Sequence, residues 1–548
     1  MKLKTSGFFK NNWHLLLISF LSFLLVYISS FVKAYGFFID EFYYIACASR
    51  PAMGYVDHPP LAPLILTAFQ SLFGNSLYAI RILPALALAS SVFLTGMLTR
   101  ETGGKRFSQS LASLSMASIP VAVAFAGFYS MNAFEPVIAI VLLYIFIKII
   151  KYADAKADEI KTDEIKTDEI KTDDVKAKPA GLYNHPSLYI WAGIVMGLGV
   201  MNKHTFVLFI FALLLSLFFT GRWRLVINKW FFASSVIAFL IVLPNIIWQV
   251  VNDFPSLEFY RNISLNKNVY TPPLEFIKGQ IIAMSFTVLP VWLAGVIFLL
   301  FSKRVNKYRF MSVLFILLFL FMMLSGTSRF DRLLFAYPAV LAGGAMFYEM
   351  ILTKYNLKWL KGAAMIIVAA GLIIALPLIL PYYSYDYVGS HVKKLGINTE
   401  IEKGKKPPLP QLLADRIAWK DKFDLVLKAW YSLPQNERSG ALIAAGNYGQ
   451  AGAIEYYSQN IPDFPRVVTA HNNYYLWNRG KLKGSLLLQL DGKHNFEKYR
   501  QVFDSVQIYP GEFVNSYVSP HENNLVVFIC RGPKMPFNVM LDRSKFYY

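Results

Sequence analysis

Two adjacent acidic residues, Asp40 and Glu41, follow an apolar run near the start of the chain. An ionised carboxylate beside a bilayer costs several kcal/mol of free energy unless another group compensates it. Burial also tunes a carboxylate towards accepting a proton, as a general base must. We therefore interpret the pair as a source of a general base, and because adjacent side chains point in different directions, we expect only one to act. The alternative is a pair of acids at the N-terminus of the helix that FYYIACAS indicates.

A second polar cluster, Asp57-His58, follows before the next apolar run. Pro59 and Pro60 come directly after it, so the chain is stiff there and His58 is biased away from helix. We predict that His58, Asp57 and the nearby Tyr55 contact substrate. The alternatives are a packing role for His58 and a place in an interfacial aromatic belt for Tyr55.

Membrane helices must position these residues, because the composition is that of a membrane protein. The 548 residues are 55% hydrophobic and only 16% charged, whereas soluble proteins carry roughly a quarter charged residues. The apolar runs are long enough to cross a bilayer as helices, and they lack the alternation of barrel strands. We predict a polytopic α-helical membrane protein with about eleven spans, at residues 13–33, 77–99, 107–127, 131–150, 187–201, 204–220, 230–250, 277–301, 310–325, 334–350 and 361–381.

The net charge of +20 lies largely in the connections between apolar runs. A basic balance is also typical of nucleic-acid binding, but here alternate connections are basic, which indicates the positive-inside bias and attraction to anionic lipid. We therefore predict no nucleic-acid partner. We place the basic connections in the cytoplasm, together with the linker 151–186 and its DEIKT repeat at 158–176. The opposite connections then face the periplasm of a bacterial inner membrane: 34–76, the turns near Ser130 and Lys203, 251–276, 326–333, and the tail from 382.

The tail has a different character, with more Pro, Gly and Asn and shorter apolar runs. ALIAAG (441–446) followed by YGQAGAIEYYS indicates a strand entering a helix, and VVTA, SLLLQL, SVQIY and NLVVFIC indicate further strands. We predict a transmembrane catalytic domain over 1–381 and a periplasmic α/β domain over 382–548. The two cysteines, Cys47 and Cys530, indicate neither a disulfide framework nor a thiolate metal site. No ligand spacing demands a metal, although the acids are compatible with a divalent one.

The order of several motifs resembles a family of membrane enzymes. The Asp-Glu pair after the first span and the H-P-P-L turn before the second are followed by YSMNAFEP (129–136), GLGVMNKHT (197–205), RFDRLLFAYPA (329–339), GNYGQAGAIEYY (446–457) and HNNYYLW (471–477). In this order they are similar to bacterial glycosyltransferase family 39, which has the GT-C fold and is related to the protein O-mannosyltransferases and the lipid A aminoarabinose transferases. The resemblance runs from the first apolar run into the tail.

The resemblance implies an inverting transfer of a sugar from a polyprenyl-phosphate donor to an acceptor hydroxyl on protein Ser/Thr, lipid A or another surface glycan. It implies that Asp40 is the catalytic base, with Glu41 or Glu135 assisting. A phosphodiester leaving group departs as a stable anion, so it needs cations and no general acid. The cationic candidates that face outward are His58, Arg81, Lys203, His204, Arg329 and Arg332.

Three of these cations also have a simpler explanation. Arg81 lies just inside a helix start, where a long side chain can extend to the interface. Arg329 and Arg332 could form an internal ion-pair cluster. A buried cation at Lys203-His204, in the middle of an apolar region, is expensive and favours a functional role.

The chain departs from its relatives at two positions. The aminoarabinose transferases carry a lysine before the Pro-Pro pair, whereas this chain has His58, as the mannosyltransferases do. Relatives often place an aspartate at the start of the fourth span, where this chain has Asn132, with Glu135 one helical turn further on the same face. Glu135 could alternatively be a carboxylate favoured in a first helical turn. We assign Asn132 to substrate binding, together with the tail residues Tyr448, Gln450, His471 and Asn472.

A transporter or flippase of lipid-linked sugars is the alternative function, because intramembrane charges can mark a translocation path. Against it, the two halves of the chain show no internal repeat, and the polar residues gather on one side of the membrane. A polymerase or ligase of surface glycans would share the donor chemistry without these motifs. The expected partners are therefore a polyprenyl-phosphate sugar, a protein or glycolipid acceptor, and the bilayer.

Overall fold

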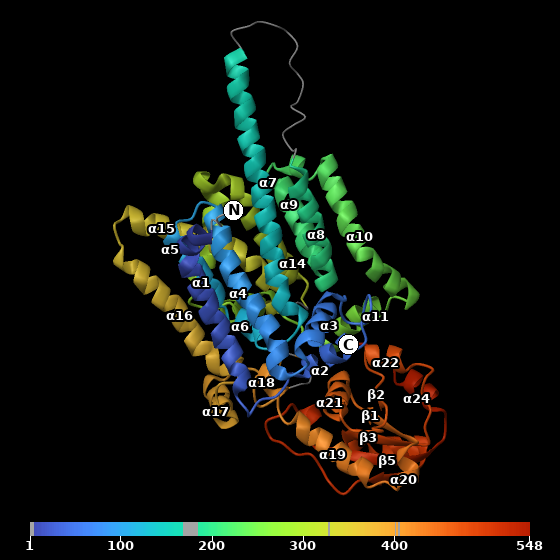
Figure 1. Ribbon diagram of the computed structural model, residues 1–548. Coiled ribbons are helices and arrows are strands. Elements are labelled where there is room, and N and C mark those ends of the chain that lie inside the picture. Colours follow the sequence, from blue (N-terminus) through green and yellow to red (C-terminus); the bar gives the residue numbers. More distant parts are fainter. Residues whose placement is uncertain (1–4, 168–184, 327–328, 401, 404–405) are drawn as a thin grey trace.

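The structure is a computed structural model that describes residues 5–167, 185–326, 329–400, 402–403 and 406–548. A bundle of long apolar helices forms one part of the molecule, and a smaller domain built on a β-sheet lies against one end of it (Figure 1). The N-terminal helix belongs to the bundle, and the C-terminus lies near the junction of the two parts.

The chain is a multi-pass membrane protein. Among the described residues, seven helical segments are long and apolar enough to cross a bilayer. A bent pair, α5 (Arg106–Ala117) and α6 (Pro120–Ala126), adds an eighth span if its two arms, bent by 62° at the break between them, are counted together. The seven segments contain α1 (Thr5–Ile28), α4 (Leu77–Glu101), α7 (Met131–Thr167), α10 (Lys229–Val251), α14 (Arg309–Leu324), α15 (Tyr337–Lys354) and α16 (Trp359–Ile379).

Eight of the predicted spans therefore correspond to a long helix or to the bent pair. Residues 187–201 and 204–220 form the shorter apolar helices α8 (Pro186–Asn202) and α9 (Phe206–Phe219). The prediction of one continuous helix over 277–301 is wrong, because it breaks into α12 (Pro273–Ala283) and α13 (Leu289–Phe301). Ser285 in the break has a φ of 70°, which is incompatible with a right-handed helix.

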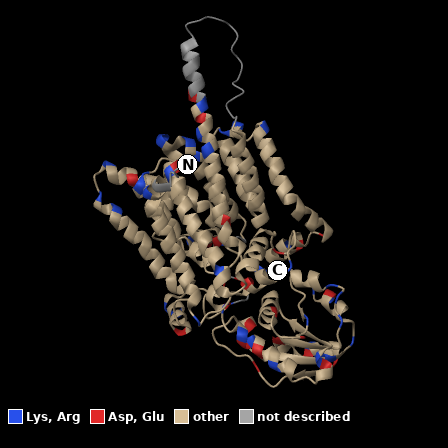
Figure 2. Cartoon of the chain, in the orientation of Figure 1, with Lys and Arg blue, Asp and Glu red and all other residues tan. Residues whose placement is uncertain are grey.

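Charge divides the bundle as the sequence predicts. Figure 2 shows Lys and Arg gathered at the end from which α7 protrudes, while the middle of the bundle carries little charge. The sheet domain lies at the opposite end (Figure 1). The linker expected over 151–186 is helical as far as Thr167, where α7 ends, and the rest of it up to residue 184 lies outside the described residues.

The connection 34–76 folds into two helices, α2 (Ile39–Ala48) and α3 (Leu61–Phe73). Helix α2 packs against α21 (Tyr448–Ser458) of the sheet domain, and two glycines permit this approach. A Cβ atom on Gly449 would lie 2.1 Å from a side-chain carbon of Ile39, and one on Gly452 would lie 3.0 Å from the backbone carbonyl of Phe42. The acidic stretch is therefore fixed between the bundle and the sheet domain.

The sheet domain contains the five strands expected from the sequence, in the spatial order β2-β1-β3-β5-β4. Strand β1 pairs in parallel with β2 and β3, whereas β5 runs antiparallel to β3 and β4. Both faces of the sheet are apolar and buried, with Ile443 and Leu488 on one side and Leu442 and Leu487 on the other. The strands are β1 (Ala441–Ala445), β2 (Val467–Val468), β3 (Leu486–Gly492), β4 (Phe503–Ile508) and β5 (Leu525–Pro533).

Helices cover this sheet and connect it to the bundle. Besides α21, they are α17 (Tyr385–Leu395), α18 (Gln411–Ala414), α19 (Trp419–Tyr431), α20 (Gln435–Arg438), α22 (Asn473–Asn478), α23 (Phe496–Val502) and α24 (Phe537–Arg543). The sheet lies away from the membrane helices in Figure 1, and the elements that contact the bundle include α17 and α18, which pack on α16, and α21, which packs on α2.

Candidate active site

A cavity of about 460 Å³ lies where the bundle meets the sheet domain. Its walls come from α2, the 57–58 turn, the start of α7, the turn after α8, the 259–268 segment, the 329–332 segment and several loops of the sheet domain. Nine of the residues singled out in the sequence line it: Asp40, Asp57, His58, Asn132, Lys203, Arg329, Arg332, Tyr448 and His471. The fold therefore brings together residues that are more than four hundred positions apart in the sequence, as Asp40 and Tyr448 are.

Asp40 lies in the first turn of α2, where the helix N-terminus favours a carboxylate. The Tyr448 hydroxyl donates a hydrogen bond of 2.8 Å to Asp40 Oδ1. Burial raises the pKa of the Asp40 carboxyl above its ordinary value, against the opposing effect of that hydrogen bond. A carboxylate in this environment is a stronger proton acceptor than one in water, as a general base needs to be.

Glu41, the neighbouring acid, does not line the cavity. Its two oxygens accept hydrogen bonds from the Arg81 guanidinium at 3.0 and 2.7 Å, and from the backbone N–H groups of Phe38 and Tyr129. Both charged side chains are almost completely buried, at 0% and 1% exposure. The predicted phosphate ligand Arg81 thus positions the start of α2 through Glu41 and the carbonyl oxygen of Gly36, and neither Glu41 nor Arg81 reaches the cavity.

Lys203 is one of the predicted cations that line the cavity. The Lys203 ammonium contacts Glu135 Oε2 at 2.8 Å and Asn132 Oδ1 at 3.0 Å, so Asn132 and Glu135 do share a helix face as predicted. Of these three residues, only Lys203 and Asn132 reach the cavity. Glu135 balances the charge of Lys203 from behind the wall.

Arg329 and Arg332 reach the same cavity from the segment before α15. Arg329 forms a two-point ion pair with Asp331, at 2.7 and 3.1 Å. Arg332 has only a long contact of 3.5 Å, to the amide oxygen of Asn268, among the hydrogen bonds of the described residues. Arg332 is therefore the cation of this wall whose charge is least compensated by direct contacts.

His58 also lines the cavity and is held there by aromatic rings. Its ring stacks on Tyr44 with centroids 4.8 Å apart and an angle of 12° between the planes. Nδ1 lies 3.0 Å from the carbonyl oxygen of Pro59, while Nε2 is buried, has no hydrogen-bond partner in the described structure, and lies 3.9 Å from Asp57 Oδ1. Asp57 in turn accepts a hydrogen bond of 2.9 Å from the Tyr43 hydroxyl. His58 and Asp57 are thus positioned for a polar ligand.

Two predicted ligands lie behind the walls. His204 is fixed by Asn245 at 3.0 Å and by the Tyr260 hydroxyl at 3.2 Å. His204 does not line the cavity, so it is not placed to contact a donor phosphate. The Tyr55 hydroxyl bonds to the backbone around residues 47–52 and stabilises the turn that carries the 57–58 pair.

In the tail, Tyr448 and His471 line the cavity, whereas Gln450 and Asn472 do not. The amide of Gln450 bonds to Gly446 and Glu522 inside the sheet domain. Asn472 is buried and has a φ of 47°, so it shapes the backbone of the loop that carries His471.

Sequence reasoning missed several residues of the cavity wall, including Lys267, Glu402 and Asp415. Lys267 and Glu402 form an ion pair of 3.2 Å that joins the 251–276 connection to the tail. Burial raises the pKa of Asp415 to about 7, although Ser519 donates a hydrogen bond of 2.9 Å to it. Asp415 could have been singled out, because it stands beside an arginine in the otherwise apolar stretch LADRIAW. Lys267 and Glu402 could not, because each is an isolated charge in a polar loop.

The described residues contain no group of three or more His, Cys, Asp or Glu side chains arranged to hold a metal ion. The cavity wall instead offers carboxylates, among them Asp40, aromatic rings and the four cations Lys203, Lys267, Arg329 and Arg332. Such an arrangement can take up a proton at a carboxylate and stabilise an anion at the cations.

Comparisons with known proteins agree with this architecture. Residues 181–248 match the family described as dolichyl-phosphate-mannose-protein mannosyltransferase. The crystal structure of ArnT from Cupriavidus metallidurans bound to undecaprenyl phosphate is similar over 94% of this chain and 97% of that one, with a TM-score of 0.55 and 12% identity. Its apo structure gives a TM-score of 0.54 over the same shares, also at 12% identity. None of the curated proteins compared with the sequence matches it.

An oligosaccharyltransferase from Archaeoglobus fulgidus has a TM-score of 0.48 and 15% identity, over 90% of this chain and 71% of that one. The similarity to ArnT over nearly the whole length of both chains confirms the fold that the sequence motifs imply. This protein has the GT-C fold of membrane glycosyltransferases, with a small sheet-containing domain after the bundle.

Proposed function

We propose that this protein is an inverting glycosyltransferase that moves a sugar from a polyprenyl-phosphate donor to an acceptor hydroxyl. One observation carries the proposal: Asp40 and the cations Lys203, Arg329 and Arg332 line a single cavity at one end of a GT-C bundle. The lipid found with ArnT, undecaprenyl phosphate, belongs to the donor class proposed for this chain.

In the proposed reaction, the Asp40 carboxylate takes the proton of the acceptor hydroxyl. The acceptor oxygen attacks the anomeric carbon of the donor sugar, and the bond between that carbon and the phosphate oxygen breaks. The polyprenyl phosphate leaves with the bonding electron pair, and no proton donor is needed because the leaving group is a stable anion. Fixed cations stabilise the charge that develops on the phosphate.

Arg332 is the principal phosphate ligand in this proposal, because its guanidinium has the weakest partner of the three cations. Arginine suits a phosphate because its planar fork donates two parallel hydrogen bonds. Lys203 and Arg329 add positive charge while Glu135 and Asp331 hold them in place. Glu41, Arg81 and His204 become positioning residues in place of the direct roles that the sequence predicts.

The sheet domain completes the proposed site. Tyr448 orients Asp40 through its hydroxyl, and His471 forms part of the adjoining wall. We assign the acceptor to this side and the donor phosphate to the wall of Lys203, Arg329 and Arg332. The basic end of the bundle lies opposite the cavity, which supports a periplasmic active site in the inner membrane by the positive-inside rule.

The test is release of free polyprenyl phosphate from a labelled polyprenyl-phosphate sugar by purified protein in the presence of a hydroxyl acceptor. Asp40→Asn should lower turnover by about 10²- to 10⁴-fold, the usual contribution of a general base, with an unchanged unfolding temperature. Asp421→Asn is the matched control, because Asp421 is also an acid in a first helical turn but is exposed and outside the cavity.

Near-normal turnover of Asp40→Asn would refute the assignment of the base. Counterflow of intact donor across vesicles without any release would instead favour the transporter. A metal requirement is checked in the same assay by adding EDTA, and a loss of turnover that Mg²⁺ or Mn²⁺ restores would add a divalent ion to the mechanism.

A further inference from the structure

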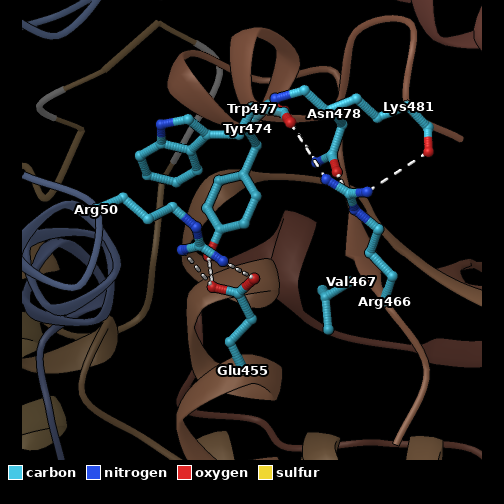
Figure 3. A pocket seen from close by; sticks show the side chains of 8 residues that line it. All are labelled: Arg50, Glu455, Arg466, Val467, Tyr474, Trp477, Asn478 and Lys481. Atoms are coloured by element: carbon cyan, nitrogen blue, oxygen red, sulfur yellow. Dashed lines mark hydrogen bonds and ion pairs between the residues drawn. The ribbon is translucent and has the colours of Figure 1, made fainter. Parts of the chain in front are cut away.

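A second pocket, of about 230 Å³, lies beside the proposed active site and has no role in the reaction described above. Figure 3 shows Arg50 entering it from the bundle side and Arg466 from the sheet domain, with Val467 between them. Arg50 follows α2, so the pocket is built across the junction of the two parts of the molecule. Its other lining residues are Glu455, Tyr474, Trp477, Asn478 and Lys481.

The pocket is adjacent to the cavity, because one aromatic side chain contacts both. Tyr43 lines the cavity, and its ring centroid lies 6.4 Å from those of Tyr474 and Trp477 in the pocket. The Tyr43 hydroxyl also donates to Asp57 and accepts a hydrogen bond from the backbone N–H of Asn473. A molecule that binds in the pocket therefore lies one aromatic ring away from the proposed acceptor side.

The charge of the pocket is positive. Three cations, Arg50, Arg466 and Lys481, face a single carboxylate, that of Glu455, so the formal sum is 3 − 1 = +2. Glu455 is already engaged, because it forms a two-point ion pair with Arg50 and accepts a hydrogen bond of 2.8 Å from the Tyr474 hydroxyl. The carboxylate thus holds Arg50 in position and leaves the pocket with a surplus of positive charge.

Arg466 is fixed by the loop that forms the rest of the pocket. Its guanidinium donates to Asn478 Oδ1 at 2.8 Å and to the Trp477 carbonyl at 3.2 Å (Figure 3). Lys481 follows on the same loop, is exposed, and lies along the upper edge of the pocket in Figure 3. The 477–481 segment therefore fixes Arg466 and also carries Lys481.

An aromatic ring borders these charges. Trp477 is half-buried, and the Arg50 guanidinium lies 4.6 Å from the centroid of its ring. Indole rings offer a broad apolar face that packs on the apolar face of a sugar ring, whereas a simple inorganic anion has no apolar surface to bury against it. The combination of an aromatic wall with surplus cations matches a ligand that has both a ring face and an acidic group.

We propose that this pocket binds a saccharide that carries an acidic group and serves as a subsite for the acceptor. The acidic group contacts the Lys481 ammonium, and the sugar ring packs against Trp477. The two arginines, whose guanidinium groups are bonded to Glu455 and to the 477–481 segment, add positive charge from the pocket wall. The inference that an acidic saccharide binds here depends only on the residues of the pocket. The assignment of that saccharide as the acceptor rests on the proposed glycosyltransferase function. The acceptor class is then an anionic glycan.

Binding is measured by titration calorimetry on the full-length protein in nanodiscs, without any donor. The probe is digalacturonate, a disaccharide with two carboxylates, and the comparison ligands are neutral lactose, inorganic phosphate and a triglutamate peptide. We expect saturable binding of digalacturonate, no detectable binding of lactose at the same concentration, and weaker binding of phosphate. Affinity should fall as the salt concentration rises, because the pocket is open to solvent.

Lys481→Gln should weaken digalacturonate binding about fivefold, as expected for the loss of one partly exposed charge contact. Lys483→Gln is the matched control, because Lys483 is exposed on the same loop but does not line the pocket. Trp477→Leu should weaken binding roughly tenfold, and Trp477→Phe should restore part of the loss. Circular dichroism of each variant checks that the sheet domain is folded.

The proposal is overturned if digalacturonate binds no better than lactose, if phosphate or a triglutamate peptide binds equally well, or if Lys483→Gln weakens binding as much as Lys481→Gln. Transfer assays separate this failure from failure of the proposed function. Donor turnover with an uncharged acceptor but no binding of digalacturonate would refute the pocket alone. Binding without release of polyprenyl phosphate from any donor would refute its assignment to an acceptor.

Discussion

Loss of one partner of the Glu41–Arg81 ion pair should cost far more stability than its place outside the cavity suggests. The pair is completely buried, and the carboxylate accepts four hydrogen bonds, two from Arg81 and two from the backbone N–H groups of Phe38 and Tyr129. Removing one partner of a buried pair costs about 3–5 kcal/mol, because the other charge is left uncompensated. Glu41→Gln and Arg81→Met should therefore each lower the free energy of unfolding by about 4 kcal/mol.

The double variant separates charge pairing from mere packing. Glu41→Gln with Arg81→Met removes both charges and leaves a neutral amide at position 41, the Phe38 and Tyr129 N–H groups and the Gly36 carbonyl to be satisfied, at about 1–3 kcal/mol for an orphaned group. The double variant should therefore lose about 3 kcal/mol, not the ~8 kcal/mol that the two single losses sum to. The coupling energy of the cycle is then on the order of 5 kcal/mol.

The assay is equilibrium unfolding of purified protein in detergent, followed by far-ultraviolet circular dichroism and tryptophan fluorescence. Glu275→Gln is the control, because Glu275 forms an exposed pair with Lys278 at 2.8 Å and should change stability by at most ~0.5 kcal/mol. Additive losses in the cycle, or single variants no less stable than the control, would refute the reasoning.

Two further outcomes concern the junction and the sheet domain. Gly452→Ala should loosen the contact of α21 with α2, because the new Cβ would lie 3.0 Å from the Phe42 backbone. Limited proteolysis between the bundle and the sheet domain should then become faster. Gly362→Ala is the control and should have no effect, because the space around Gly362 is open. Although burial opposes it, the Lys422 ammonium and neighbouring hydrogen bonds together hold the pKa of Glu522 at about 2, against 4.5 ordinarily. The ionised Glu522 therefore stabilises the fold above about pH 4.5, and this contribution is lost as the pH falls towards 2. The difference in unfolding free energy between wild type and Glu522→Gln, measured by urea unfolding, should decrease to zero over that range. A difference that stays constant with pH would contradict this.

The long membrane helices could be predicted from the sequence, because spans such as 77–99 are continuous apolar runs whose length the bilayer dictates. Residues 277–301 are equally apolar, yet they break at Ser285, where a left-handed backbone conformation interrupts the helix. Hydropathy records how apolar a segment is and does not record the dihedral angles within it. The break was therefore beyond the reach of this kind of reasoning.

The candidate site could be predicted in part. The sequence shows that both Asp40 and Glu41 need a compensating partner beside the bilayer. Their environments differ because Glu41 pairs with Arg81 and Asp40 bonds to Tyr448, and both partners come from distant parts of the chain. The ion pair of Lys267 and Glu402 joins two loops that carry no local pattern. Local sequence identifies which residues can do chemistry. Whether such a residue faces the cavity or supports its wall depends on partners that long-range packing brings to it.

The hydrogen bond from Tyr448 to Asp40 has a consequence for how the protein is made. The acid is synthesised early, but its partner belongs to a domain that emerges from the ribosome only after the whole bundle. A nascent chain that has inserted every membrane helix still lacks one wall of its cavity. The cavity is therefore complete only after the sheet domain has folded against the bundle, so unfinished chains hold an incomplete site.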